Sequence, residues 1–387
     1  MWSKLQILLI ITVILCSSCI SSEDFLLEAR FHTQEYLPEY DMQPDYAVSG
    51  GSVCRKDKVY YYKPFYNFNY IYYYDETSGI SGKVCGKAEC THHSRECNAF
   101  CNSPCGIQIY DGMLYFIEND ALYRMDLSGN RREKVMFLRS MEGMNAKFAL
   151  HRGYIYTSVV QDIMQEGKPQ MRFTLCQQIL GQTETKKIII DKTMAGTAVE
   201  KWLIQGNHLY LALDDCRTED MLFTNEFYRY DIGTDELDSL RTDYTEWGII
   251  GMRTGHASIE MIQKSIQNGI RISRYDWNTK KISEPFQLQA AGSMGFIILS
   301  EEQILEYSSI GKLEYKLSDR KGSVIRKGVL PEPSSASKHT SLIGDGSDSE
   351  GFLVEMLNFD TGEARLLRIP YDGTEVQILI YLLETEA

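Results

Sequence analysis

A short phrase recurs along this chain from about residue 48 onward and limits the folds that the chain can adopt. Its clearest copy is Tyr110–Ile117, followed after a short gap by Ala121–Asn130. Asp111-Gly112 is a strong turn signal, and the alternation of apolar and polar residues after it predicts a half-buried strand. The phrase returns at residues 205–213 and 227–233. Each copy therefore predicts short antiparallel strands joined by tight turns.

The spacing of the copies predicts how these strands are grouped. The aspartates that end the second half of the phrase are Asp75, Asp126, Asp231 and Asp276, at gaps of 51, 105 and 45 residues, and a degraded copy near Cys176 divides the long gap. Several strands every 40–50 residues are typical of propeller blades. A two-sheet sandwich would not repeat one phrase at this length, and no segment shows a long amphipathic helical pattern.

We therefore predict an all-β fold, a β-propeller of seven blades. The blades are expected to start near residues 48, 105, 147, 200, 247, 292 and 341, with six or eight blades as alternatives. The composition agrees, because 25 Tyr against only 9 Pro favours strands over linkers. The net charge of −13 disfavours a nucleic-acid partner, since an acidic surface repels phosphate backbones.

The first residues predict the location of the protein. Lys4 precedes the apolar run Leu5–Leu15, which is too short to span a bilayer and fits the hydrophobic region of a secretory signal. The following Cys16-Ser17-Ser18-Cys19 resembles a bacterial lipoprotein signal, in which the cysteine after small residues is acylated. Cys16 departs from that pattern, where an aliphatic residue is usual, and a plain secretory signal is the alternative.

The resemblance implies three segments: a signal peptide over residues 1–18, a lipidated N-terminus and tether over 19–45, and the propeller domain over 46–387. Cys19 is the expected site of lipidation, with palmitate among the acyl groups. The protein is then expected at the cell membrane, on its extracytoplasmic face, held to the membrane through an N-terminal lipid.

Five of the ten cysteines fall between residues 85 and 105. Cys85, Cys90, His92 and Cys97 offer three thiolates and one imidazole, the ligand count of a closed structural zinc site. His93 is the alternative imidazole ligand. Disulfides are the competing interpretation, because a secreted chain with an even number of cysteines is normally paired. A catalytic or redox role is the third.

Two parts of the sequence resemble known families. The paired phrases at Asp111–Tyr115 and Leu122–Gly129 resemble the YWTD and TolB-like propeller repeats. The stretch Val84–Phe100 is similar to a group of uncharacterised β-propeller lipoproteins of Gram-positive anaerobes, from which this chain departs by the extra Cys101 and Cys105. The resemblance implies the fold and the location, and no activity.

The remaining motifs favour a structural role. The eight tyrosines of residues 60–74 could form an aromatic platform for sugar rings, but core packing is the favoured interpretation, as it is for Trp202, Trp247 and Trp277. Asp345–Glu350 is expected to be a solvated hairpin. The sequence contains none of the common nucleophile, metalloprotease or nucleotide-binding motifs. We therefore expect a binding module for an unknown protein or glycan ligand, with a surface enzyme acting on carbohydrate or cell-wall material at the propeller funnel as the alternative.

Overall fold

The fold is taken from a computed structural model, and the described part of the chain begins beyond the predicted signal peptide. Cys19 and Cys105 also lie outside the described residues. Those residues are 37, 39–41, 51–64, 68–102, 106–138, 147–165, 167–194, 197–217, 222–241, 245–254, 258–265, 267–283, 285–288, 296–308, 313–331 and 340–383.

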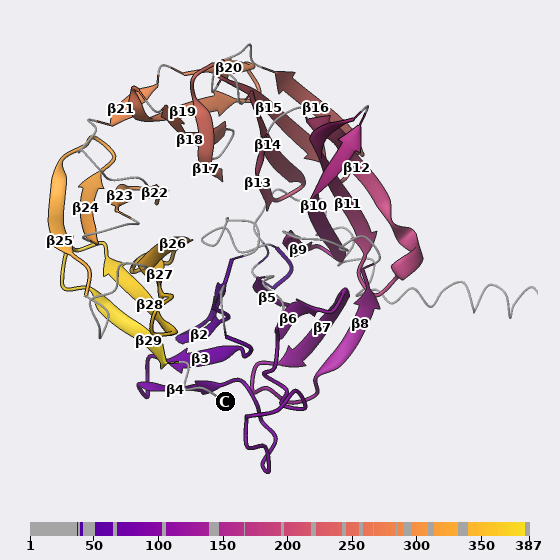
Figure 1. Ribbon diagram of the computed structural model, residues 1–387, viewed down its shortest axis with the longest axis vertical. Coiled ribbons are helices and arrows are strands. Elements are labelled where there is room, and N and C mark those ends of the chain that lie inside the picture. The colour runs from indigo at the N-terminus through magenta and orange to yellow at the C-terminus, as the bar shows by residue number, and fades with distance from the viewer. Residues whose placement is uncertain are drawn as a thin grey trace, which may run out of the picture.

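Seven antiparallel sheets are arranged in a ring around a central axis (Figure 1). Blades 1 to 3 comprise β1 (Val53–Lys56), β2 (Val59–Tyr62), β3 (Tyr72–Asp75) and β4 (Ile80–Lys83); β5 (Ile107–Tyr110), β6 (Met113–Glu118), β7 (Ala121–Asp126) and β8 (Glu133–Phe137); and β9 (Lys147–His151), β10 (Tyr154–Gln165), β11 (Lys168–Ile179) and β12 (Lys187–Met194). A single 3₁₀ turn, η2 (Thr183–Thr185), lies between β11 and β12.

Blades 4 to 7 follow the same plan. They comprise β13 (Thr197–Gln205), β14 (His208–Arg217), β15 (Leu222–Asp231) and β16 (Glu236–Arg241); β17 (Gly248–Thr254), β18 (Ser258–Ser265), β19 (Gly269–Asp276), β20 (Lys281–Ile282) and β21 (Phe286–Leu288); β22 (Phe296–Leu299), β23 (Gln303–Tyr307), β24 (Glu314–Asp319) and β25 (Val324–Val329); and β26 (Thr340–Ser347), β27 (Gly351–Asn358), β28 (Glu363–Pro370) and β29 (Gln377–Leu383). In blade 5, both β20 and β21 pair with β19.

The predicted propeller is confirmed, with seven blades and first strands that begin within a few residues of the expected positions. Strands follow one another in chain order in every blade, and the first strand lies nearest the axis (Figure 1). Turns between the first and second strands and between the third and fourth strands therefore share one end of the ring, which we name the turn end. Among the described residues there is no α-helix, and no helix there is long and apolar enough to cross a membrane.

The repeated aspartates have a defined local role. Each ends the third strand of its blade and accepts hydrogen bonds from backbone N–H groups of the next turn, which satisfies donors that have no acceptor on a neighbouring strand. The distances are 2.8 Å for Thr77 to Asp75, 2.7 Å for Asn130 to Asp126, 2.9 Å for Thr234 to Asp231 and 2.9 Å for Thr279 to Asp276. Asp319 accepts in the same way from Lys321 and Ser323, although the sequence repeat did not reveal that copy.

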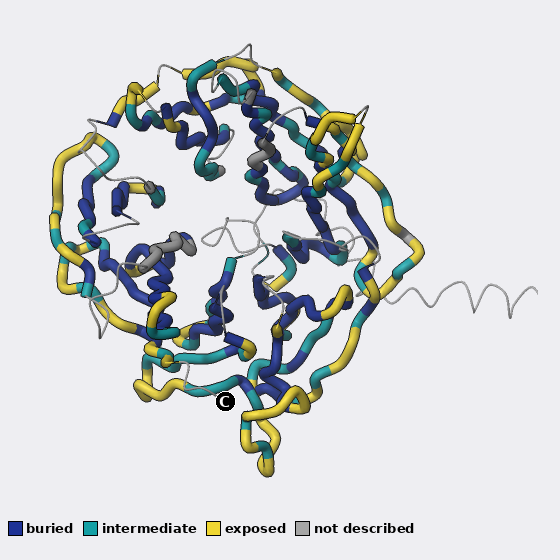
Figure 2. Tube along the Cα trace, viewed as in Figure 1, coloured by how far each residue is buried: buried dark blue, intermediate teal, exposed yellow. Residues whose placement is uncertain are grey.

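Apolar side chains between neighbouring blades form the core (Figure 2). Tyr60, Tyr61 and Tyr62 are buried, so core packing is confirmed for the first part of the tyrosine-rich stretch. The three tryptophans predicted to lie in the core, Trp202, Trp247 and Trp277, are also buried. Buried residues fill the middle of each blade, whereas the outermost strands at the rim are largely exposed (Figure 2).

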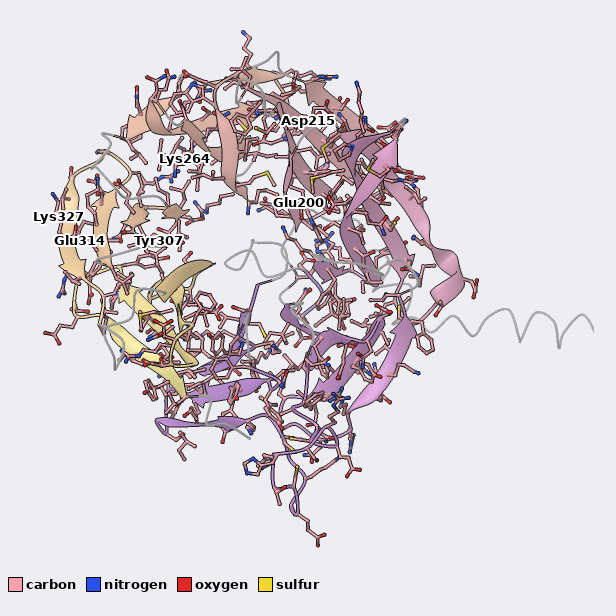
Figure 3. All side chains as sticks on the ribbon, in the orientation of Figure 1. Glu200, Asp215, Lys264, Tyr307, Glu314 and Lys327 are labelled. Atoms are coloured by element: carbon pink, nitrogen blue, oxygen red, sulfur yellow. The ribbon has the colours of Figure 1, made fainter. Side chains whose placement is uncertain are left out.

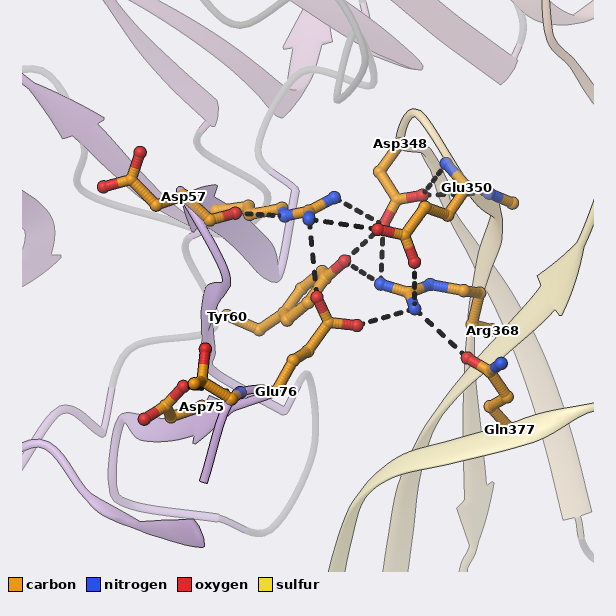
Figure 4. Close-up of polar contacts among 11 residues, drawn as sticks. Asp57, Tyr60, Asp75, Glu76, Asp348, Glu350, Arg368 and Gln377 are labelled. Carbon is orange, nitrogen blue, oxygen red and sulfur yellow. Dashed lines mark hydrogen bonds and ion pairs between the residues drawn. The ribbon is translucent and has the colours of Figure 1, made fainter. Parts of the chain in front are cut away.

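Blade 7 closes the ring against blade 1 without exchanging a strand. Leu353 and Leu366 of blade 7 pack in one cluster with Val53, Tyr60 and Tyr62 of blade 1. A polar network, the seam network of Arg55, Tyr60, Glu76, Asp348, Glu350 and Arg368, covers the turn end of this junction (Figure 4). Because every blade is one continuous stretch of chain, no strand is shared, and in the described part of the chain the first and last blades are held together by these side-chain contacts.

Arg368 is the centre of the seam network (Figure 4). Its guanidinium lies 2.6 Å from Glu76, 2.8 Å from Glu350 and 3.2 Å from Asp348. Asp348 is only 6% exposed, and the Tyr60 hydroxyl donates to it. The prediction of a solvated hairpin at Asp345–Glu350 was therefore wrong for Asp348, because this carboxylate is turned into the junction between blades.

Part of the predicted tether lies against the body. The carbonyl of Glu39 accepts a hydrogen bond from the Asp111 N–H at 2.6 Å, and that of Tyr40 accepts one from the Arg152 N–H at 2.7 Å. The Tyr40 ring packs edge-on against Tyr110, with 5.9 Å between ring centroids. Asp111 and Arg152 occupy the first turns of blades 2 and 3, so the N-terminal segment docks at the turn end of the ring.

Candidate metal centre

The four predicted ligands lie in the segment that joins β4 to β5, which projects from the rim between blades 1 and 2 (Figure 1). Two tight turns fold this segment back on itself: the Cys90 N–H donates to the Lys87 carbonyl at 3.2 Å, and the Cys97 N–H donates to the Ser94 carbonyl at 3.1 Å. His92 has a φ of 59°, so the backbone reverses between the two turns. The chain thereby returns Cys97 to the side of Cys85.

The ligand atoms of Cys85, Cys90, His92 and Cys97 all lie within 4.8 Å of one another. Cys97 Sγ is 3.5 Å from His92 Nδ1. Three soft sulfur ligands and one imidazole around a single point match the donor set of a structural zinc site. His93, the alternative ligand, is exposed and lies outside this group.

The seven cysteines of the described residues are free thiols. Cys54 and Cys101 belong to the core between blades 1 and 2, while Cys176 and Cys216 are buried in blades 3 and 4. Only three of the cysteines between residues 85 and 101 therefore share a site. The disulfide interpretation joins sulfurs in pairs and gives no role to the imidazole, whereas the observed arrangement uses all four side chains.

Hydrogen bonding within the cluster favours a thiolate at Cys85. Burial alone would raise the pKa of Cys85, but the backbone N–H groups of Lys87 and Asn98 and the thiols of Cys97 and Cys90 donate to its sulfur and lower the pKa overall. Burial, with the hydrogen bonds to Cys85 and Cys90, raises the pKa of Cys97 to about 12. The lowered pKa of Cys85 favours the thiolate, the form that binds a cation, whereas the raised pKa of Cys97 means that a cation binding there displaces a proton.

Lys83 faces the cluster from the end of β4. Its Nζ donates to the His92 carbonyl at 2.6 Å and lies 3.7 Å from the centroid of the Tyr70 ring. Burial lowers the pKa of Lys83, and the nearby Cys97 and Cys90 oppose that shift. Zinc with three thiolates and a neutral imidazole carries one negative charge, so a lysine here has the complementary sign.

The cluster is attached to blade 2 through the turn between β7 and β8. The Gly129 carbonyl accepts hydrogen bonds from the Gly86 N–H at 3.1 Å and from Asn98 Nδ2 at 2.8 Å. Gly129 has a φ of +79°, and a Cβ atom there would lie 2.5 Å from the Val84 carbonyl oxygen. Arg132 donates to the carbonyls of Cys97 and Asn98 at 3.4 and 3.3 Å. A metal in this position would therefore fasten blade 1 to blade 2.

The sequence motif revealed the ligands but not the residues that support them. Lys83 and Asn98 adjoin the ligands in sequence but belong to no metal-binding spacing, and Arg132 reaches the ligands only through the tertiary structure. Gly129 was visible only as a turn residue. Its second role, close approach to the Cys85 backbone, depends on how two blades pack.

Comparison with known proteins supports the fold. No protein-family model matches the chain, and no curated protein matches it. Among solved structures, it is similar to a prolyl endopeptidase described for its inter-domain dynamics, with a TM-score of 0.56 and 13% identity over 94% of this chain and 52% of that one. It is also similar to the acylaminoacyl peptidase of Pyrococcus horikoshii, with a TM-score of 0.51 and 12% identity over 88% and 54% of the two chains.

A third similar structure is prolyl oligopeptidase B of Galerina marginata, with a TM-score of 0.51 and 10% identity over 94% of this chain and 53% of that one. The chain thus spans about half the length of each of these structures. At such low identity the likeness shows a shared propeller fold and leaves activity to be argued from the site.

Proposed function

We propose that this protein is a membrane-anchored extracytoplasmic lipoprotein whose propeller serves as a rigid binding module. The anchor rests on the sequence Lys4, Leu5–Leu15 and Cys19. The module rests on the ring itself, because seven packed blades fix the turns at one end and a ligand then binds without a large ordering cost. The peptidases of similar fold are about twice as long, so their activities are not carried over.

The second part of the proposal is a structural zinc ion held by Cys85, Cys90, His92 and Cys97. The observation that carries it is the convergence of four ligand atoms within 4.8 Å. A metal there stabilises the projecting segment, which otherwise has few apolar side chains to order it.

Metal analysis tests the zinc site. The domain would be purified anaerobically without a metal-binding tag and analysed for zinc per chain, for free thiols and for melting temperature. We expect about one zinc per chain, loss of zinc in C90S and C97S, and a lower melting temperature after chelation. The control is C216A, which removes a buried cysteine outside the cluster and should retain the metal. A metal-free wild type whose thiols are all oxidised would replace this proposal with a disulfide framework.

Acyl labelling tests the anchor separately. The full chain, expressed in a bacterium with a labelled palmitate analogue, should carry the label and fractionate with membranes. C19A should lose both properties, and C16A should keep them. Absence of the label from the wild-type chain would contradict the anchor and would have no bearing on the zinc site.

One observation supports the enzyme alternative, a surface enzyme acting on carbohydrate or cell-wall material. Lys201 lies on β13, the strand of blade 4 nearest the axis, and directly follows Glu200, which is labelled in Figure 3. Burial lowers the pKa of Lys201 to about 8, and burial raises the pKa of the adjoining Asp214 to about 8. Shifted pKa values are frequent at catalytic sites, but Asp214 is 1% exposed and already accepts hydrogen bonds from Asn225 and the Ile249 N–H, so Lys201 is the member of this pair that a substrate would meet. Hydrolysis of cell-wall fragments by the wild type but not by K201M would favour this alternative.

A further inference from the structure

Three charged residues stand side by side across blade 5. Arg253 on β17 is paired with Glu260 on β18, and Glu260 is paired with Arg274 on β19. Residues opposite one another in an antiparallel sheet point to the same face, with Cβ atoms about 4.5–5.5 Å apart. Arg253 and Arg274 therefore flank one carboxylate, at 3.8 and 3.0 Å from its oxygens.

Blade 6 adds a third arginine to the same carboxylate. Arg320, in the turn between β24 and β25, forms an ion pair with Glu260 through its Nη2. Glu301, in the turn between β22 and β23, lies 3.4 Å from Arg253 and is 85% exposed at its side chain. We name Arg253, Glu260, Arg274, Arg320 and Glu301 the arginine cluster; it lies at the turn end of the junction between blades 5 and 6.

The charges of the arginine cluster do not balance. Glu260 is 5% exposed and can neutralise only one of three guanidinium groups, while the exposed Glu301 is largely solvated and neutralises Arg253 weakly. The Arg274 side chain is 59% exposed and largely solvated, so the excess positive charge that an anion would offset lies on Arg253 and Arg320, which are 26% and 22% exposed. The excess is local, because the whole chain carries a net charge of −13.

One donor of the cluster has no acceptor. Arg320 Nη1 is buried and has no hydrogen-bond partner within the part of the chain that the structure describes. A buried N–H group without an acceptor costs about 1–3 kcal/mol, so native proteins nearly always supply one. The seam network between blades 7 and 1 also contains a buried donor without a partner among the described residues, Arg368 Nε, but its charge balance is the reverse: two arginines there face three carboxylates, so an added anion would be repelled.

We propose that the arginine cluster binds a phosphate group, either inorganic phosphate or the phosphate of an ester. Guanidinium groups bind phosphate oxygens through pairs of parallel N–H donors, which a single carboxylate cannot fully occupy. The phosphate takes the place of the exposed Glu301 beside Arg253 and accepts from Arg320 Nη1. This site goes beyond the proposed function, because it depends on neither the lipid anchor nor the zinc ion, and it gives the module one ligand chemistry.

Calorimetric titration at constant ionic strength tests the site, with inorganic phosphate and glycerol phosphate as the two probes. We expect wild-type protein to bind phosphate, R320Q and R253Q to bind at least tenfold more weakly, and E301Q to bind several-fold more tightly because a competing carboxylate is gone. R241Q is the matched control, because Arg241 also forms an ion pair with a buried glutamate: it lies 3.4 Å from Glu226 in blade 4. Its affinity for phosphate should equal that of wild type.

The two probes distinguish the sources of phosphate. Binding of both assigns the site to a phosphate group in either form, binding of glycerol phosphate alone assigns it to esterified phosphate, and binding of inorganic phosphate alone assigns it to the free ion. The proposal is overturned if neither probe binds at millimolar concentration, or if R241Q weakens binding as much as R320Q does. Because E301Q is expected to gain affinity, the test does not depend on a destabilised variant.

Discussion

The carboxylate of Asp41 accepts two parallel hydrogen bonds from the guanidinium of Arg152, at 2.6 Å from Nε and 2.9 Å from Nη2. Both side chains are 1% exposed, although 111 residues of chain separate them. Arg152 also donates to Asn207 of blade 4 at 2.9 Å. The pair thus ties the N-terminal segment to the first turns of blades 3 and 4.

Removing one member of this pair should destabilise the whole domain. D41N leaves the Arg152 charge buried without its partner, and loss of one partner of a buried ion pair costs about 3–5 kcal/mol. Urea unfolding of D41N, R152M and the double variant would measure the coupling, and the double variant should be less destabilised than the sum. R172Q, which breaks the exposed pair of Arg172 with Asp191, should move the unfolding midpoint little.

Truncation provides an independent measure of the same contact. A domain that starts at residue 36 keeps Asp41, whereas one that starts at residue 46 loses it. We expect the shorter domain to unfold at lower urea concentration by an amount similar to the effect of D41N. Equal stability of the two domains would show that the docked segment contributes nothing.

Closure of the ring should depend on Arg368. R368M leaves the buried Asp348 with a weaker pairing to Arg55 at 3.4 Å and leaves Glu76 without its nearest cation, so we expect a loss of about 3–5 kcal/mol. Thermal unfolding with limited proteolysis of blades 1 and 7 would measure it. R124M, at an exposed pair with Glu133, should cost less than about 1 kcal/mol. A similar loss in both variants would contradict a specific role in closure.

His151 should make stability depend on pH in the acidic range. Burial lowers its pKa to about 4, against an ordinary value of 6.5, and its Nε2 lies 2.7 Å from the Gly206 carbonyl. Between these values the unfolded chain binds a proton that the folded protein does not bind. This part of the stability is therefore complete above pH 6.5 and is lost as the pH falls towards 4.

The loss amounts to at most about 3 kcal/mol for a shift of this size. H151Q should flatten the dependence of the unfolding free energy on pH between 6.5 and 4, measured by urea titration at several pH values. H208Q, at a half-buried histidine beside Asp231, should flatten it less. An unchanged slope in H151Q would mean that other groups cause the acid sensitivity.

Two glycines with similar backbone angles should respond differently to alanine. At Gly112, with φ +68°, a Cβ atom meets nothing within 4 Å, so G112A should cost only the strain of about 1–2 kcal/mol. At Gly129 the Cβ atom also collides with the Val84 carbonyl and the Cys85 N–H. G129A should therefore be less stable than G112A and should lower the zinc content as well. Equal losses of stability and equal zinc contents in G129A and G112A would show that the turn at Gly129 does not support the metal centre.

The repeat was sufficient to predict the fold because its signals are local. Asp111-Gly112 adopts the two positive φ angles that such a turn requires, and the aspartates at strand ends hold the next turn through their own carboxylates. These preferences act over a few residues, so they can be predicted from the local sequence. Blade 6 was located from spacing alone, since Asp319 serves there without the tyrosine phrase around it.

The candidate sites divide in the same way. The spacing of four ligands that are close in sequence predicted a common site: Cys85, Cys90, His92 and Cys97. Asp41 and Arg152, Tyr60 and Asp348, and the three arginines around Glu260 meet only after the ring closes. Asp348 was wrongly predicted to be exposed, because a run of polar residues is normally solvated. Its burial depends on the ion pair with Arg368, which is not apparent from the sequence.

The unbroken blades have a consequence for how this protein can change over time. Each blade is folded from one stretch of about fifty residues and contacts chiefly its two neighbours, so stability is distributed along the chain as in a linear repeat array bent into a circle. Duplication or loss of one such stretch leaves the sheets of the other blades intact and requires new side-chain packing only between the blades that become neighbours. The first and last blades are the exception, because their junction joins stretches that are far apart in the sequence. New blades are therefore best tolerated between the existing ones, away from Arg368.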